Sequence, residues 1–165
     1  MFNVGDLIIY GTNGVCKVDD IGTLNISGSS KDRLYYTLSP VYMKGRKLFT
    51  PVDNKKVVFR PILSMVEALQ LIDTINDVET LLVPDEKQRN AIFNNAYKSC
   101  DCTLLIKIIK TLSHKNLSRK KEGKKNVASD ERNLQLAEDI LYGELAISLG
   151  MEKENVMNFI TQRTA

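Results

Sequence analysis

The side chains that most often carry catalysis or bind metals are few in this sequence of 165 residues. Its single histidine, His114, stands beside Lys115 at the end of a predicted helix, where a solvated or helix-capping role is expected. Cys100-Asp101-Cys102 brings two thiols together, but no second pair and no histidine at ligand spacing completes a tetrahedral zinc site. Phosphate-loop, nucleophile-elbow and dinucleotide motifs are absent from the sequence. We therefore expect a protein that is not an enzyme and needs no metal or cofactor.

Phosphate-binding chemistry is better represented, because positive charge is concentrated in one part of the chain. The net charge of +3 hides a neutral stretch over residues 1–83, +7 over 84–125 (eleven basic, four acidic) and −4 over 126–165 (three basic, seven acidic). The run Lys115–Lys125 is predicted to be a loop between two helices. It is interpreted either as a solvated linker or as part of a surface that binds nucleic-acid phosphates. The preceding helices would add Lys87, Arg89, Lys98, Lys107 and Lys110 to that surface. Because Asn and Gln do not alternate with Arg on a helical face of the run, backbone contact is favoured over base readout.

Composition excludes several classes of protein. The start MFNVGDLIIY has no basic region followed by a long apolar stretch, so we expect no signal peptide. No run reaches the ~18 apolar residues of a membrane-spanning helix. Three cysteines are too few and too odd in number for a disulfide framework, which indicates a reducing cytoplasm. We expect a cytoplasmic monomer with no membrane contact.

The predicted secondary structure that positions these residues changes from strands to helices near residue 62. The first part alternates at period two and predicts five short strands, typical of a small Tudor/SH3-like β-barrel. The expected strands are Val4–Tyr10, Val15–Leu24 with a bulge at Gly22, Arg33–Tyr42, Arg46–Pro51 and Lys55–Arg60. Asn13-Gly14 predicts a tight turn with positive φ, and residues 26–32 a polar loop.

The strand Arg46–Pro51 is short and amphipathic, with its charges at one end. Two interpretations of it stay open. An exposed edge could accept a strand from a partner protein. Alternatively, Arg46 and Lys47 could simply guard the edge against aggregation.

The rest of the chain predicts an all-α helical bundle. Ser64 and Glu67 form a capping box, and Asp85, Asp101 and Ser129 are expected to cap three further helices. A last short helix carries Val156, Phe159 and Ile160. The expected organisation is an α+β protein with a β-barrel domain over residues 1–62, a connecting helix and linker over 63–83 and a helical DNA-binding domain over 84–165.

Three groups of residues together resemble the CarD/CdnL family of bacterial RNA-polymerase-binding transcription regulators, over almost the full length. At the front stand Phe2-x-Val4-Gly5-Asp6-x-Ile8-Ile9-Tyr10, Gly14-Val15 and Ile21-x-Thr23. Pro51-Val52-Asp53-Asn54 is followed by Val57 and Arg60-Pro61-Ile62. The most specific match is the run of Leu, Ala, Ile, Gly and Glu between Ser129 and Ala146.

The resemblance implies that the two parts of the chain bind different partners. The Tudor-like domain would bind the β subunit of RNA polymerase through an edge strand; the same module occurs in the transcription-repair coupling factor. The helical domain would contact promoter DNA near the upstream edge of the −10 element and stabilise the open complex. The implied polymerase contacts are Leu24, Arg46, Lys47, Leu48, Phe49, Thr50 and Pro51. The implied DNA contacts are Glu86, Lys87, Arg89, Lys98, Lys110, Lys115, Arg119, Lys120, Lys121, Lys124, Lys125 and Arg132.

The sequence departs from the family pattern at two places. Glu86 stands near the position where many members carry a Trp that wedges at the melted junction, and this chain has no Trp. Phe49 stands where many members carry an Arg in the polymerase-facing strand. We hypothesise that the longer basic run from 116 to 126 supplies phosphate attraction that partly replaces the wedge. The alternative functions are a protein-interaction adaptor without DNA binding and an RNA-binding Tudor/SH3-like protein.

Overall fold

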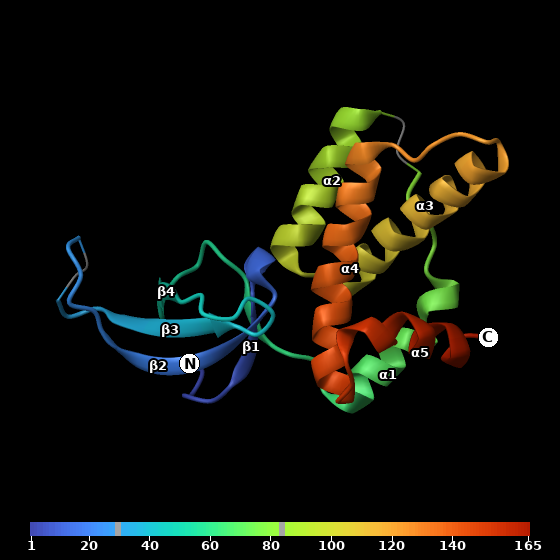
Figure 1. Ribbon diagram of the computed structural model, residues 1–165. Coiled ribbons are helices and arrows are strands. Elements are labelled where there is room, and N and C mark those ends of the chain that lie inside the picture. Colours follow the sequence, from blue (N-terminus) through green and yellow to red (C-terminus); the bar gives the residue numbers. More distant parts are fainter. Residues whose placement is uncertain (29–30, 83–84) are drawn as a thin grey trace. The chain divides into compact units, whose positions relative to one another are not determined.

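The computed structural model describes residues 1–28, 31–82 and 85–165, which divide into two compact units, Met1–Ile62 and Leu63–Ala165 (Figure 1). The first unit is an antiparallel sheet of five strands and the second consists of helices, which confirms the mixed α+β composition. The expected boundary at residues 83 and 84 lies outside the described residues, as do residues 29 and 30 of the polar loop.

The strands are β1 (Leu7–Tyr10), β2 (Val15–Thr23), β3 (Leu34–Pro40), β4 (Leu48–Pro51) and β5 (Phe59–Pro61). Their order across the sheet is β4-β3-β2-β1-β5. A 3₁₀ turn at Gly11–Asn13 joins β1 to β2, and Gly14 takes the predicted positive φ, +69°. The bulge, however, lies between Val18 and Asp20 and not at Gly22, which pairs in register with Tyr35. Asp19 is the extra residue there, and its carboxylate finds polar partners on β3 and beside β4.

The sheet is not closed into a barrel, so the predicted Tudor/SH3-like barrel is wrong in this respect. β4 and β5 are its two edges, and within the described residues no ladder joins them. The chain between them is held as a loop instead, because Asn54 donates to the Thr50 hydroxyl at 3.0 Å and accepts from the Lys56 amide at 2.8 Å. A sheet that stays open keeps its edge strands available.

The sheet unit has its own small core, formed by Ile8, Cys16, Val18, Tyr36 and Leu38. Inward residues alternate with outward ones along β2 and β3, as a sheet with one buried face requires. Partly buried aromatic rings pack against this core, and the ring centroids of Tyr10 and Phe59 lie 4.9 Å apart. Burial raises the pKa of the Cys16 thiol to about 11.

The helices are α1 (Met65–Asp73), α2 (Glu86–Ser99), α3 (Cys102–Lys121), α4 (Ala128–Leu149) and α5 (Val156–Arg163), with 3₁₀ turns at Ile75–Asp77 and Lys153–Asn155. The Ser64–Glu67 capping box is confirmed, and Asp85 and Asp101 cap α2 and α3 as predicted. The Ser129 cap is wrong, because α4 begins at Ala128, two residues earlier than that cap implies, with Val127 as its N-cap and no capping side chain. Asp130 and Glu131 then fall in the first turn, where acidic groups complement the helix dipole.

The basic run is mainly helical and not a loop. α3 continues through Lys121, and only residues 122–127 connect it to α4. Lys, Arg and Leu are good helix formers, and Arg119, Lys120 and Lys121 complement the dipole in the last turn. Gly123, with φ +74°, lies just beyond that end.

A single apolar core holds the helical unit together, with Phe93, Leu105, Ile108, Leu141 and Leu145 among its fully buried members. Residues of α1 belong to it, since Ala68 and Ile72 have no exposed area. Met65, at the first position of α1, is exposed, although the apolar spacing of Met65, Ala68 and Ile72 predicts one buried face. Buried Glu144 of α4 accepts the Leu63 amide at 3.0 Å and so anchors the start of the unit. None of the helices described for this chain is long and apolar enough to span a membrane.

Candidate protein and nucleic-acid interfaces

The predicted polymerase strand forms one edge of the sheet. β4 pairs with β3 on one side, with Leu48 opposite Leu38 and Phe49 opposite Thr37. Its other side carries no strand within the described residues. Side chains alternate along it, so Thr50 is buried while Phe49 is 49% exposed. β4 therefore presents an unpaired backbone edge together with one large apolar side chain.

The remaining residues of the predicted polymerase set flank this strand. Lys47 donates to the Asp19 carboxylate at 2.5 Å and to the Ser39 hydroxyl at 2.8 Å. The Ser39 hydroxyl also donates to the Asp19 carboxylate, and the hydrogen bonds from Lys47 first and Ser39 second lower the pKa of Asp19 below its ordinary value. Arg46 is exposed, with its guanidinium 3.4 Å from the Met43 sulfur. Leu24 follows β2 at the end of the sheet where Pro51 lies, as the register of β2, β3 and β4 shows.

Two residues of the predicted DNA set contact a buried carboxylate. Asp130 has no exposed side-chain area, and its oxygens lie 3.1 Å from Arg89 Nη1 and 2.5 Å from Lys115 Nζ. Because two cations share one buried anion, the Asp130 cluster (Arg89, Lys115, Asp130) joins α2, α3 and α4. The Arg89 guanidinium also lies 5.6 Å from the centre of the Phe93 ring. The charged groups of Arg89 and Lys115 are thus bound to Asp130, although Lys115 remains partly exposed.

Lys110 is likewise engaged internally. Its ammonium donates to the backbone carbonyls of Ile75 at 2.8 Å and Val78 at 2.5 Å. These bonds fix the segment that follows α1 against α3. Its role in the structure is to hold this segment.

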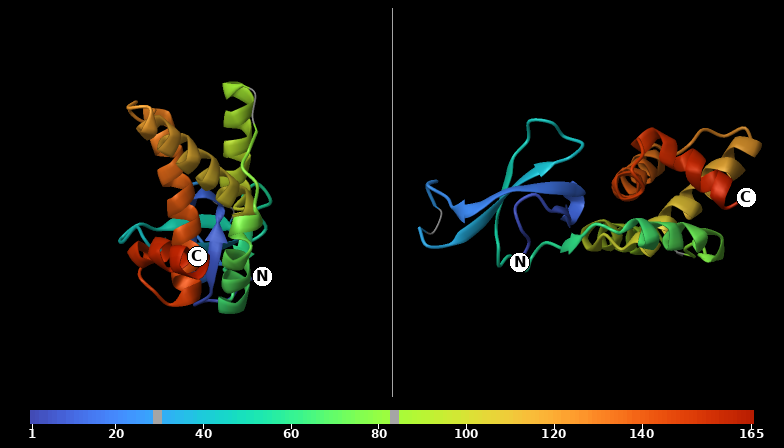
Figure 2. Two further views of the ribbon diagram at one scale, coloured as in Figure 1. Left: turned by 90° about the vertical axis from the view of Figure 1, so that its right-hand side faces the viewer. Right: turned by 90° about the horizontal axis from the view of Figure 1, so that it is seen from below.

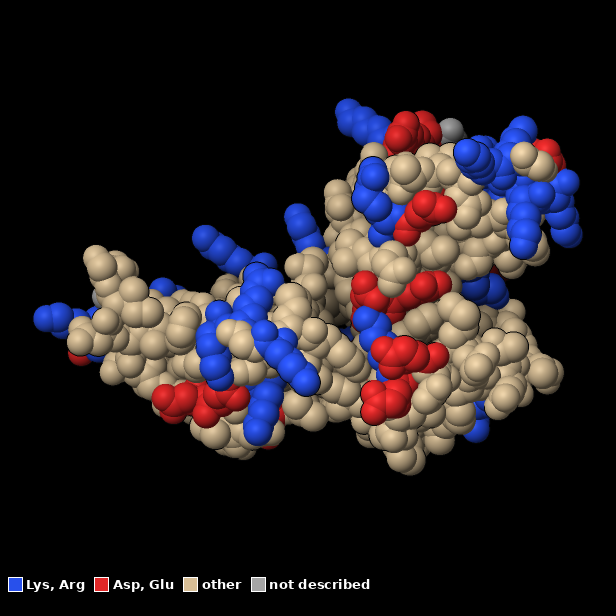
Figure 3. Space-filling model, viewed as in Figure 1, with Lys and Arg blue, Asp and Glu red and all other residues tan. Residues whose placement is uncertain are grey.

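Five basic residues gather where α3 ends and the loop to α4 begins, and we call them the basic tip: Arg119, Lys120, Lys121, Lys124 and Lys125. Figure 3 shows the blue side chains clustered there, whereas acidic side chains run along α4 on the same face. Arg119 Nε donates to the Lys125 carbonyl at 2.8 Å, which closes the loop. Lys124 and Glu122 form an exposed ion pair of 3.0 Å, a kind of pair that contributes little stability.

The other predicted DNA residues lie on α2 and α4. Glu86 and Lys87 occupy the first turn of α2, and exposed Arg132 lies near the start of α4. These helix starts and the end of α3 are at the same end of the helical unit (Figures 1 and 2). Lys98 is eleven residues further along α2 than Lys87, about 16 Å at the helical rise. It is therefore the outlying member of the set.

The side chains considered for catalysis or metal binding are dispersed. His114 is exposed and lies within α3, not at its end. Cys100 is buried in a left-handed conformation with φ +54°, and its thiol lies 3.4 Å from the Tyr97 carbonyl. Cys102 lies 3.6 Å from a Glu144 carboxylate oxygen. Among residues 1–28, 31–82 and 85–165, no group of three or more His, Cys, Asp or Glu side chains could hold a metal ion.

Two features of the interface were not predicted. The sequence gives no sign that two cations from other helices enclose Asp130. An open hollow of about 640 Å³ also lies between α3 and the start of α4, lined in part by the basic tip. Its polar residues come from separate elements, so their spacing along the chain gives no sign of it.

Comparison with known proteins bears on the sheet unit. Residues 2–63 match the family model described as the CarD-like/TRCF RID domain. A search of curated proteins gave no match. The matched domain implies an RNA polymerase-interacting, transcription-related protein. The CarD-like resemblance is thereby confirmed over residues 2–63, and the chain is consistent with a CarD-like family member.

Proposed function

We propose that this chain is a transcription regulator that binds the β subunit of RNA polymerase through β4 and promoter DNA through the helical unit. The observation that carries the proposal is the CarD-like/TRCF RID match over a sheet whose edge strand β4 is open. An open edge can accept a partner's strand, with backbone hydrogen bonds giving affinity and alternate side chains giving specificity. Phe49 is the side chain on β4 that is placed to give that specificity.

The DNA contact falls on the basic tip, with Lys87 and Arg132 at the same end of the unit. Exposed lysines can neutralise backbone phosphates and release counterions, which drives binding without regard to sequence. Arg89, Lys110 and Lys115 instead position the elements, because their charged groups already bind Asp130 or backbone carbonyls. Lys98 is peripheral to the contact, and Glu86, although it stands beside Lys87, carries a negative charge that phosphates repel.

The protein acts by binding and not by catalysis, as a cytoplasmic monomer without metal or cofactor. Tethered to polymerase through β4, it raises the local concentration of the basic tip at the upstream edge of the −10 element. If it binds the melted promoter better than the closed one, it shifts the equilibrium toward the open complex by its difference in affinity.

A pull-down with the isolated β lobe of RNA polymerase tests the first contact. Phe49→Asp should abolish binding, because it places a charge in the apolar centre of the docked edge. Val4→Asp is the matched control, since Val4 is also exposed and lies outside β4. Binding that survives Phe49→Asp, or that Val4→Asp abolishes equally, would rule out β4 as the docking edge.

A further inference from the structure

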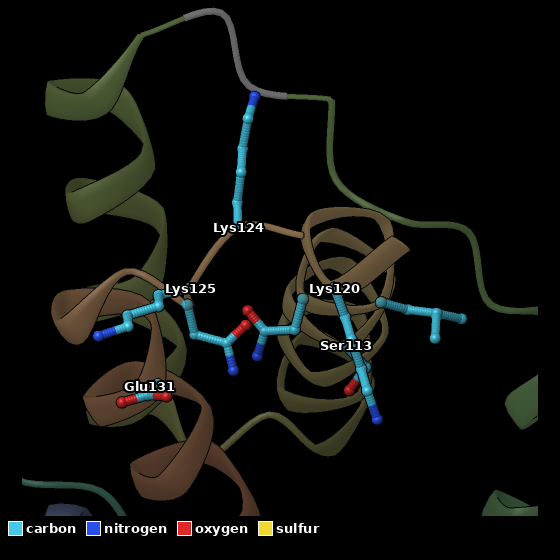
Figure 4. Close-up of a pocket in the computed structure, with 8 residues that line it drawn as sticks. Ser113, Lys120, Lys124, Lys125 and Glu131 are labelled. Atoms are coloured by element: carbon cyan, nitrogen blue, oxygen red, sulfur yellow. The ribbon is translucent and has the colours of Figure 1, made fainter. Parts of the chain in front are cut away.

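The hollow between α3 and the start of α4 combines a basic rim with polar and apolar walls (Figure 4). Asn116 and Leu117 of α3 form one side, and Asn126 and Glu131 form the other. Its volume of about 640 Å³ lies within the range of small-molecule sites. The hollow is therefore large enough for a nucleotide.

The lysines lie at the rim and diverge from one another. In Figure 4, Lys124 extends away from the hollow, Lys125 extends to the other side above Glu131, and Lys120 extends from α3. Three divergent ammonium groups do not enclose a single phosphate ion. They suit a chain of phosphates that passes across the opening.

Glu131 provides a hydrogen-bond acceptor in the hollow, and a second acceptor, on Asn116, lies buried in its wall. Asn116 Oδ1 is buried and has no hydrogen-bond partner among the described residues, which is uncommon in folded proteins. The Glu131 carboxylate also lines the hollow, and Glu131 itself is exposed. The exposed Glu131 carboxylate can accept N–H donors from a base that replaces its water, whereas Asn116 Oδ1 becomes available to a base only if the side chain turns toward the opening. Leu117 is 54% exposed and provides an apolar surface against which a ring can lie.

We propose that this hollow binds one unpaired guanine nucleotide of a single strand, with its base inside and its phosphates on the lysines. This inference rests on the proposed DNA-binding function. Guanine carries adjacent N1–H and N2–H₂ donors on its Watson–Crick edge, which a carboxylate can accept as a pair. In a duplex those donors are bonded to cytosine, so only an unpaired base offers them. The site thereby favours melted over closed DNA.

Fluorescence anisotropy of the full chain at low salt tests this, with an oligo-dT strand and the same strand carrying one central dG as probes. The dG strand should bind about tenfold more tightly, as a good bidentate base contact gives. Glu131→Gln should remove that preference while strengthening binding of plain oligo-dT, because it also removes a repulsive charge. Guanosine monophosphate that competes as strongly as the dG strand would assign the same site to a free nucleotide.

Glu122→Gln is the matched control. It removes the same charge from an exposed residue beside the basic tip that does not line the hollow, so it should strengthen both strands alike. Equal affinity for the two strands in the wild-type protein, or identical behaviour of Glu131→Gln and Glu122→Gln, would overturn the guanine site. If the guanine site is overturned but the wild-type chain still binds duplex DNA in a salt-dependent way, the proposed DNA-binding function stands. If the wild-type chain binds no duplex DNA at all, the DNA-binding function itself is overturned.

Discussion

Single residues show how positive charge in this protein is divided between internal contacts and the exposed surface. Three cations that the sequence predicts for DNA binding make internal contacts instead. Arg89 and Lys115 bind Asp130, and Lys110 donates to backbone carbonyls. Residue type and charge predicted the basic region correctly. They could not show which cations form internal ion pairs and which stay exposed, because the ion pairs depend on which carboxylates become buried when α2, α3 and α4 pack together.

The Asp130 cluster gives a direct prediction of stability. Asp130→Asn leaves Arg89 and Lys115 without their buried anion, and removing one partner of a buried ion pair costs about 3–5 kcal/mol. Since Lys115 is partly exposed, we expect a loss toward the lower end of that range, measured as the free energy of unfolding in urea. Asp139→Asn, which breaks a more exposed pair with Lys153, should cost about 1 kcal/mol or less. Equal losses for the two variants would contradict a structural role of the cluster.

Helices and strands were predictable where local chemistry decides them. The capping box at Ser64 and the caps at Asp85 and Asp101 have side chains that bond their own helix starts, so the sequence contains the whole interaction. The start of α4 and the position of the bulge depend on partners distant in sequence. Barrel closure also escaped the strand pattern, because alternation along each strand does not tell whether the two edge strands β4 and β5 pair.

The capping box of α1 makes a prediction for a single element. Ser64→Ala removes the acceptor for the Glu67 amide, at 3.1 Å in the structure, and should lower the free energy of unfolding by about 1 kcal/mol. Because α1 contributes Ala68 and Ile72 to the core, the loss should be seen in the unfolding of the helical unit as a whole. Ser64→Asp retains a capping side chain and should restore most of the stability. An Ala variant as stable as the wild type would show that packing alone holds α1.

At the scale of the whole molecule, the net charge says little about a nucleic-acid partner, whereas the distribution of charge along the chain shows where phosphates could be bound. A formal charge of +3 would suggest no nucleic-acid partner, yet the Lys and Arg side chains of the basic tip form one cluster (Figure 3). The sequence located this charge correctly along the chain. The sequence predicted that this charge lies in a loop, whereas most of it lies on the last turns of α3. The helix fixes the spacing of the lysines there.

The salt dependence of duplex binding tests the basic tip. The slope of log affinity against log salt is about −0.9 per phosphate contacted, so replacing Lys120, Lys121, Lys124 and Lys125 by Gln should make it shallower by up to about 3.6. A control that replaces four exposed lysines of the sheet unit, Lys31, Lys44, Lys55 and Lys56, has the same change in net charge. We expect that control to retain most of the slope. Similar slopes in the two variants would mean that net charge, and not the basic tip, drives binding.

The lifetime of the open promoter complex tests the central claim most directly, because it requires both contacts at once. RNA polymerase is allowed to open a promoter, a competitor is added, and the decay of the open complex is followed with and without this protein. We predict a longer lifetime with the wild-type chain, and no lengthening with either Phe49→Asp or the basic-tip variant. A lifetime that the wild-type chain leaves unchanged, under conditions where it binds both polymerase and DNA, would contradict the account.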